Sequence, residues 1–221
     1  MPEITSHHVL HVLRQKSEDQ LVLFNGLGGE YRGIVSAITR NRVEISIIQS
    51  HDVDRESPLE ITLGLSILKR DAMNTAIQKA TELGVTHIVP VETVNTSVSR
   101  KKFEKRHEHW HQIIRSACEQ CGRTRLPTLD EVHSFAGWID TAQGELKLLA
   151  SLRSPRKLSE IQTAPHLVCL LIGPEGGISE EEEIAAVNKG FEPVSAGSRV
   201  LRAETVPTAL LSLIQFRWGD F

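Results

Sequence analysis

Residues 167–205 read LVCLLIGPEGGISEEEEIAAVNKGFEPVSAGSRVLRAET, and this stretch decides the fold. It begins with a fully apolar run, 167–172, of the kind that lies deep inside a parallel sheet. A glycine-rich loop and an acidic helix start at Ser179 follow, then a short strand over 191–196 and a second loop. A last helix is expected over 204–218. Because loops that follow neighbouring strands meet at the carboxyl edge of a sheet, these two loops can hold one small ligand.

The first loop, Gly173-Pro174-Glu175-Gly176-Gly177, favours contact between backbone and ligand, because glycine lets the main chain approach closely. It is neither a phosphate-binding P-loop, since no Lys-Ser/Thr pair follows, nor a G-x-G-x-x-G dinucleotide fingerprint. Four glutamates at 180–183 would repel a phosphate and favour a neutral or cationic ligand with an adenine-like edge. An ordinary tight turn between a strand and a helix explains the loop equally well.

The second loop, 197–202, carries charges that have two interpretations. Arg199, Arg202 and Glu204 are either exposed residues that form salt bridges or groups that handle a substrate. The residues by themselves favour the first interpretation.

Residues 58–221 alternate strands with helices, which predicts a parallel α/β sheet. Gly84 and Gly122 are natural helix ends, and Pro90 is expected at the end of a strand. Besides the elements above, the apolar spacing predicts strands over 59–68, 85–91 and 146–150 and helices over 71–83, 105–121 and 154–161.

Residues 1–57 have a different pattern, with short strands and tight turns that predict a small barrel or curled sheet. A polar segment, 51–57, precedes Pro58 and is the expected domain boundary. The expected elements are a helical turn over 7–14 and strands over 20–24, 31–38 and 42–48.

The composition is that of an ordinary globular protein: 221 residues, 40% hydrophobic and 24% charged, with a net charge of −3. This charge argues against a general coat for nucleic acid but allows a local basic patch. Basic residues gather at 100–106 and recur at Arg115, Arg123 and Arg125. This cluster predicts phosphate contact, and a solvated helix of mixed charge is the alternative.

The cysteines are too few for a disulfide scaffold and fit a reducing compartment, so a cytoplasmic location is expected. No apolar run approaches the roughly 20 residues of a membrane span, and the start lacks the apolar segment of a signal peptide. Cys118 and Cys121 form a C-x-x-C motif without the second pair that a zinc site needs. Three histidines near the start have metal-compatible spacing, but surface or RNA-facing roles are favoured, so no metal is predicted for His7, His8 and His11.

Four motifs, in order along the chain, closely resemble the 16S ribosomal RNA uracil-N3 methyltransferases of the SPOUT superfamily. They are QKATELGVTHIVP (78–90), EQCGRTRLP (119–127), IGPEGGIS (172–179) and GSRVLRAET (197–205). HVLHVLR (8–14) and FNGLGGEY (24–31) resemble that family's PUA-like RNA-binding barrel. The chain departs from the family in a short start, in Val94-Asn95 where an acidic–arginine pair is usual, and in Ala196 where leucine is usual.

The resemblance implies an α/β fold, with a trefoil-knotted parallel sheet that has helices on both faces (58–221) after a shortened PUA-like β domain (1–57). It implies S-adenosylmethionine as cofactor and methylation of N3 of a uridine in 16S rRNA, within the assembled small subunit, by a homodimer. The expected catalytic residues are Arg202, Glu204 and Arg123. The expected cofactor-binding residues are Ser151, Leu152, Gly173, Pro174, Glu175, Gly176, Gly177, Ala196, Gly197, Leu201 and Thr205. The expected RNA-binding residues are Arg14, Lys101, Lys102, Arg115 and Arg125.

Two other functions are compatible with the same residues. One is a different SPOUT reaction, such as ribose 2′-O methylation. The other is a non-catalytic RNA-binding assembly protein that has kept the fold.

Overall fold

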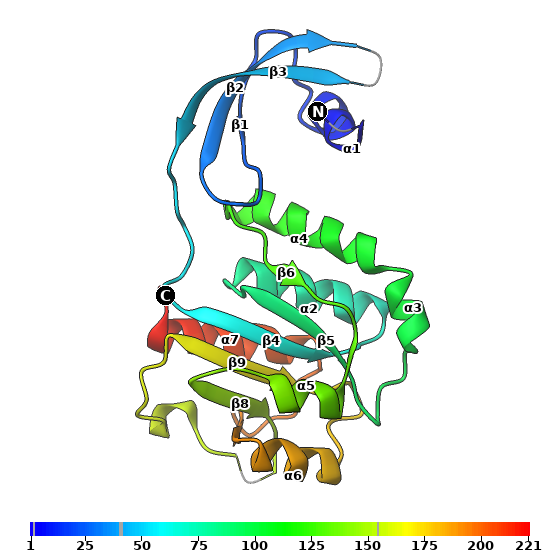
Figure 1. Cartoon of the computed structure of the whole chain (residues 1–221), viewed down its shortest axis with the longest axis vertical. Coiled ribbons are helices and arrows are strands. Elements are labelled where there is room, and N and C mark those ends of the chain that lie inside the picture. Colours follow the sequence, from blue (N-terminus) through cyan, green and yellow to red (C-terminus); the bar gives the residue numbers. More distant parts are fainter. Residues whose placement is uncertain (2, 40–41, 154) are drawn as a thin grey trace. The chain divides into compact units, whose positions relative to one another are not determined.

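The computed structural model of the chain describes residues 1, 3–39, 42–153 and 155–221. They divide into two compact units, one with Met1–Arg55 and Arg123–Arg125, the other with Glu56–Gly122 and Leu126–Phe221. A short segment from the middle of the chain therefore belongs to the N-terminal unit, which the sequence pattern does not reveal. Figure 1 shows the elements of both units. Among the described residues, no helix is both long and apolar enough to cross a membrane.

The N-terminal unit is a three-stranded antiparallel sheet with a helical segment, and its strands pair in the order β1-β2-β3. Irregular register at two points of the β2–β3 pair bends the sheet. Val9, Val35 and Val43 form its small core. The N-terminal ammonium group donates to the Val43 carbonyl at 3.0 Å and so fixes the chain start on the sheet. The elements are α1 (Glu3–His7), the π-helix η1 (His8–Val12), β1 (Gln20–Leu23), β2 (Glu30–Ile38) and β3 (Val43–His51).

Residues 123–125 complete this unit by bonding to the 26–29 loop. The Thr124 carbonyl accepts a hydrogen bond from Gly28 N at 3.1 Å, and Arg125 Nη1 donates to the Leu27 carbonyl at 2.9 Å. A Cβ at Gly28 would lie 3.0 Å from Arg125 Cζ, and the φ of Gly28 is +110°. Glycine is therefore required at 28, and the FNGLGGEY motif meets residues 123–125 of the EQCGRTRLP motif within this unit.

The larger unit contains a parallel sheet with strand order β10-β8-β9-β4-β5-β6, and β7 also pairs with β5. The two strands that precede the loops, β9 and β10, are therefore not direct neighbours, which corrects the expectation from the sequence: β8, which precedes residue 151, lies between them. The predicted trefoil knot stays a prediction. The elements are β4 (Glu60–Ser66), α2 (Arg70–Glu82), β5 (His87–Glu92), α3 (Arg100–Glu104), α4 (His107–Cys121), β6 (Thr128–Leu129), β7 (His133–Ser134), α5 (Phe135–Thr141), β8 (Leu146–Ala150), η2 (Leu158–Glu160), β9 (Leu167–Ile172), α6 (Glu180–Asn188), β10 (Phe191–Val194) and α7 (Thr205–Trp218).

Helices cover this sheet in two groups (Figure 1). Trp138 of α5 and Ala186 of α6 belong to a core cluster with Leu149, Leu171 and Phe191 of the sheet. Helix α2 packs against both α4 and α7. The central strands are almost completely buried, as expected for strands covered on both faces.

Pro90 lies inside β5 and is buried, so its expected place at a strand end is wrong. Ile88 O accepts from Asp130 N on the β6 side, and Pro90, two residues later, directs its backbone nitrogen to the same side. There β6 pairs only with residues 87–88 of β5, and β7 only with residues 91–92. The gap between β6 and β7 therefore accommodates a residue that has no N–H to donate.

Candidate functional site

A cavity of about 770 Å³ opens at the carboxyl ends of β8, β9 and β10, within the larger unit. The loops after these strands form most of its wall, and the starts of α2 and α7 complete it. This is the position at which α/β proteins bind ligands. The lining residues are Lys69, Ala72, Ala150, Ser151, Leu152, Arg153, Ile172, Gly173, Pro174, Glu175, Gly176, Gly177, Ile178, Glu183, Val194, Ser195, Ala196, Gly197, Arg199, Val200, Leu201, Arg202, Ala203, Glu204, Val206 and Leu210.

The loop 173–177 has a shape that needs its glycines. A Cβ at Gly173 would lie 2.9 Å from the Ile178 side chain and 3.0 Å from Ile178 N. Gly177 has a φ of +73°, and its N–H donates to the Pro174 carbonyl at 2.8 Å to close the turn. The Glu175 side chain leaves the loop and accepts a hydrogen bond from Lys69 N at 2.9 Å. The loop thus curls tightly and is tied to the start of α2.

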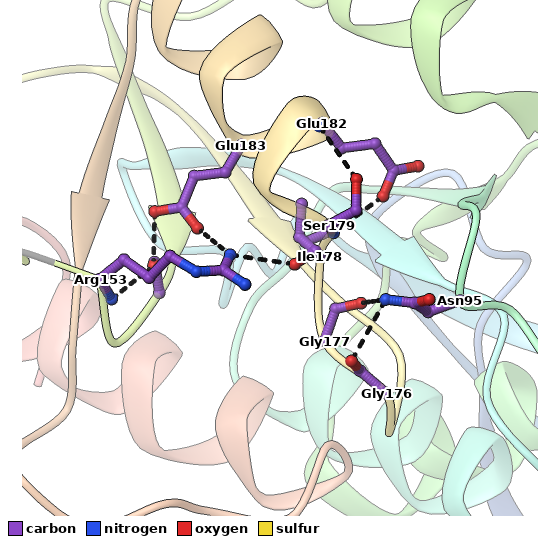
Figure 2. Close-up of polar contacts among 9 residues, drawn as sticks. Asn95, Arg153, Gly176, Gly177, Ile178, Ser179, Glu182 and Glu183 are labelled. Atoms are coloured by element: carbon purple, nitrogen blue, oxygen red, sulfur yellow. Dashed lines mark hydrogen bonds and ion pairs between the residues drawn. The ribbon is translucent and has the colours of Figure 1, made fainter.

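Helix α6 starts directly after this loop with a capping box. Ser179 Oγ accepts from Glu182 N at 3.2 Å, and Glu182 Oε2 accepts from Ser179 N at 3.1 Å (Figure 2). The other carboxylate oxygen of Glu182 accepts from Val94 N at 2.9 Å. Two of the four consecutive glutamates, Glu182 and Glu183, turn inward and are buried.

Glu183 holds a polar network on the cavity wall. Its Oε1 accepts from Ser151 Oγ at 2.7 Å, and its Oε2 forms an ion pair with Arg153 Nη1, also at 2.7 Å. The same guanidinium nitrogen donates to the Ile178 carbonyl at 3.1 Å (Figure 2). The network joins the loop after β8, the end of the glycine loop and the first turn of α6.

The second loop brings its charges to the same cavity. Gly197 has a φ of +120°, a conformation that side chains rarely adopt. The Arg202 carbonyl accepts from Thr205 N at 2.8 Å and from Val206 N at 3.1 Å, which fixes its backbone at the start of α7. The Arg202 side chain is exposed, and Glu204 stands at the N-cap without a side-chain capping bond. Both side chains are therefore available to a ligand.

The structure brings together most of the residues that the sequence predicts for this site. Of the expected cofactor-binding residues, all but Thr205 line the cavity, as do Arg202 and Glu204 of the expected catalytic residues. Thr205 is the first residue of α7. Its neighbours in the sequence line the cavity, but Thr205 itself does not. The sequence analysis missed Lys69, Arg153 and Glu183 as wall residues, although Arg153 follows the predicted 151–152 pair directly.

The expected catalytic Arg123 is not brought to this cavity. It is buried, belongs to the smaller unit and is absent from the cavity wall, so its role stays a prediction. Arg115 and Arg125 are exposed but bonded, the first to Glu108 Oε1 at 2.6 Å and the second to the Leu27 carbonyl. The remaining expected RNA-binding residues, Arg14, Lys101 and Lys102, are exposed.

The structure also places the cysteine and histidine side chains that are capable of redox or metal chemistry. Burial raises the pKa of the Cys169 thiol to about 12, so the thiol stays protonated and a poor nucleophile. The rings of His7 and His11 lie 4.4 Å apart. In the part of the chain that the structure describes, no group of at least three His, Cys, Asp or Glu side chains is arranged to hold a metal ion.

The fold and the cavity together are those of a SPOUT-type RNA methyltransferase. Residues 55–215 match the RNA methyltransferase domain family, and residues 5–48 match the RNA methyltransferase PUA domain family. The ribosomal RNA small subunit methyltransferase E of Buchnera aphidicola (Schizaphis graminum) is 34% identical over 97% of this chain and 89% of its own length. That of Bacillus subtilis is 28% identical over 96% of this chain and 87% of its own.

Comparison with solved structures indicates the same family. The Neisseria gonorrhoeae ribosomal RNA small subunit methyltransferase E, bound to S-adenosylmethionine, is similar at a TM-score of 0.93 with 36% identity, over 100% of this chain and 92% of that one. A Legionella pneumophila methyltransferase in complex with the same cofactor has a TM-score of 0.96 with 36% identity and the same coverage. The chain belongs to the ribosomal RNA small subunit methyltransferase E family.

Proposed function

We propose that this chain transfers the methyl group of S-adenosylmethionine to N3 of a uridine in 16S ribosomal RNA. The observation that carries the proposal is the single cavity in which the two glycine-containing loops meet, with Arg202 and Glu204 on its wall. The names of the relatives give small-subunit ribosomal RNA as their substrate, and the structures of two similar methyltransferases contain the bound cofactor. The uridine and its N3 atom rest on the motif resemblance.

The residues of the cavity fit this cofactor in size and chemistry. A volume of about 770 Å³ lies in the range of about 300–1,000 Å³ that is usual for small-molecule sites. Leu152, Ile172 and Leu201 offer apolar contacts for an adenine ring, and the two loops offer backbone groups for its polar edge. The absence of a phosphate on this cofactor agrees with the carboxylates beside the first loop.

The reaction requires that uridine N3 lose its proton, because the protonated nitrogen has no lone pair available for attack. The bound cofactor supplies an electrophilic methyl group and leaves as the neutral thioether. We assign the Arg202 guanidinium to the uracil carbonyl oxygens, where it stabilises the negative charge that develops as the proton leaves. We assign Glu204 to orient the base or accept the N3 proton. The rest of the acceleration comes from holding N3 in line with the methyl group.

The proposal includes a homodimer that acts on RNA in the cytoplasm, with the assembled small subunit as substrate. The family resemblance implies the dimer, and one face of α7 supports it. Val206, Ala209, Leu213 and Phe216 recur at helical spacing, and Leu213 and Phe216 are 42% and 75% exposed. An exposed apolar stripe next to the cavity suits a protein interface.

Titration with S-adenosylmethionine in a calorimeter, followed by methyl transfer to small ribosomal subunits, tests the proposal. Wild-type protein should bind the cofactor and methylate the subunits. Arg202→Ala should keep cofactor binding and lose most of the transfer, by a factor of about 10²–10³, as expected when one donor to a developing charge is removed. Arg156→Ala, which removes an exposed side chain that pairs with Glu192 and does not line the cavity, is the matched control. Wild-type turnover by Arg202→Ala would remove Arg202 from the mechanism.

A further inference from the structure

Three consecutive carbonyl oxygens of the glycine loop accept hydrogen bonds from side chains outside it. Asn95 Nδ2 donates to the Gly176 carbonyl at 3.3 Å and to the Gly177 carbonyl at 3.0 Å. Arg153 Nη1 donates to the next carbonyl, that of Ile178, at 3.1 Å. Figure 2 shows the two side chains reaching these carbonyls from different elements. Between them they hold the segment where the loop turns into α6.

Arg153 is itself held in place by the buried carboxylate of Glu183. The ion pair between them measures 2.7 Å, and Ser151 Oγ bonds to the second oxygen of Glu183 at the same distance. Ser151 Oγ also accepts from Arg153 N at 3.0 Å, which closes the network. Because the Glu183 side chain is only 9% exposed, its charge needs both partners. The guanidinium therefore meets the Ile178 carbonyl from a fixed position.

Asn95 also comes from an anchored segment. Thr93 N donates to Thr96 Oγ1 at 3.0 Å, and Val94 N donates to Glu182 in the first turn of α6. The contact with the loop is close, since a Cβ at Gly176 would lie 3.1 Å from Asn95 Cβ. The Asn95 side chain nevertheless contributes nothing to the cavity wall, so any effect on a ligand must act through the loop.

We propose that Asn95 and Arg153 are positioning residues that hold the 173–178 loop in its ligand-binding shape before the cofactor arrives. The proposal rests on the cofactor site proposed above. A loop with three glycines is flexible unless it is tied, and ordering it on binding would weaken the affinity. With the carbonyls of 176–178 already engaged, the loop meets the ligand preformed.

The experiment compares cofactor binding by substituted chains. Asn95→Asp replaces the donor by an oxygen that faces two carbonyl oxygens, so the Kd for S-adenosylmethionine should rise about tenfold or more, about 1.4 kcal/mol. Asn95→Ala, which removes the donor without adding repulsion, should give a smaller rise. Arg153→Lys should also raise the Kd, because one ammonium group replaces the fork that reaches both Glu183 and Ile178. At saturating cofactor the kcat should stay near the wild-type value while the KM rises.

Matched controls separate this role from general damage. Asn188→Asp changes an exposed asparagine at the end of α6, and Arg156→Lys changes an exposed ion-paired arginine; neither residue lines the cavity. Both should bind the cofactor like wild type. Hydrogen exchange of the amides at 173–178, measured without ligand, should be faster in Asn95→Asp than in Asn188→Asp, which a merely destabilised core would not produce.

The outcomes are distinguishable. If wild-type protein does not bind S-adenosylmethionine, the proposed function fails. If wild type binds and the Asn95 and Arg153 variants bind as tightly as the controls, or if loop exchange is unchanged in Asn95→Asp, the positioning role is overturned. Asn95 is exposed, so its variants should fold even if Arg153→Lys does not, and the Asn95 arm alone then decides.

Discussion

Glu182→Ala should destabilise the protein more than the same substitution at a solvent-exposed glutamate of the run 180–183. The Glu182 carboxylate accepts from two backbone groups, Ser179 N at 3.1 Å and Val94 N at 2.9 Å, and the residue is 8% exposed. Each hydrogen bond to a charged group contributes about 1.5–3 kcal/mol where water is excluded. Val94 is 77% exposed, so water can rehydrate its N–H after the substitution, and we expect a total loss of about 2 kcal/mol.

The assay is urea unfolding followed by circular dichroism, with Glu180→Ala as the matched control. Glu180 occupies the first turn of the same helix but is exposed, so its loss should cost about 0.5 kcal/mol through the helix dipole alone. The expected difference between the two variants is therefore about 1.5 kcal/mol, so the Tm of Glu182→Ala should be lower than that of Glu180→Ala by about 3–6 °C in a protein of this size. Equal losses in Glu182→Ala and Glu180→Ala would refute the reasoning, because both remove one negative charge and only one removes the two bonds.

Three further substitutions or treatments test other parts of the structure. Gly64→Ala should destabilise by about 1–3 kcal/mol in the same assay, because its Cβ would lie 2.1 Å from the buried Trp138 ring, and an unchanged midpoint would contradict that packing. Burial raises the pKa of the Cys169 thiol to about 12. In the native protein this thiol should therefore resist alkylation by iodoacetamide at about pH 9, where an ordinary thiol reacts. Rapid labelling of native Cys169, measured by peptide mass spectrometry, would show that the thiol is accessible. Phe216→Glu should convert the proposed dimer to monomers in light scattering, with Asp220→Lys as an exposed control four residues later in the sequence; a dimer in both variants would place the interface elsewhere.

Much of the larger unit could be predicted because its strands carry clear local signals. The apolar runs at 146–150 and 167–172 are strands with the expected bounds, and Ser179 caps α6 as its sequence position indicates. Short elements lack such signals. β6 and β7 have two residues each, and they form because β5 offers its free side to them. The expected helix over 105–121 starts only at His107, because Arg106, with a φ of −114° and a ψ of 3°, separates it from α3.

Parts of the site could likewise be predicted from local sequence patterns, whereas other parts depend on contacts between residues far apart in the sequence. The two loops were predicted because glycines and strand ends mark them in the sequence. The sequence pattern treats Glu183 as one of four charges that would repel a phosphate, whereas its side chain turns inward to meet Ser151 and Arg153, which lie about 30 residues earlier. Only the pairing of β8 with β9 brings these residues together, and no local pattern reports that pairing. Likewise, residues 123–125 join the N-terminal unit through contacts that span about a hundred positions.

The central claim is methyl transfer to N3 of a uridine in 16S ribosomal RNA, and the modified nucleoside tests it most directly. Small ribosomal subunits that lack the modification would be incubated with the protein and labelled S-adenosylmethionine, and the RNA digested for nucleoside mass spectrometry. We predict label in 3-methyluridine, reduced by a factor of about 10²–10³ with Arg202→Ala. Label in a 2′-O-methylated nucleoside would show that the family fold performs a different reaction here. Cofactor and RNA binding without any labelled nucleoside would contradict a catalytic role altogether.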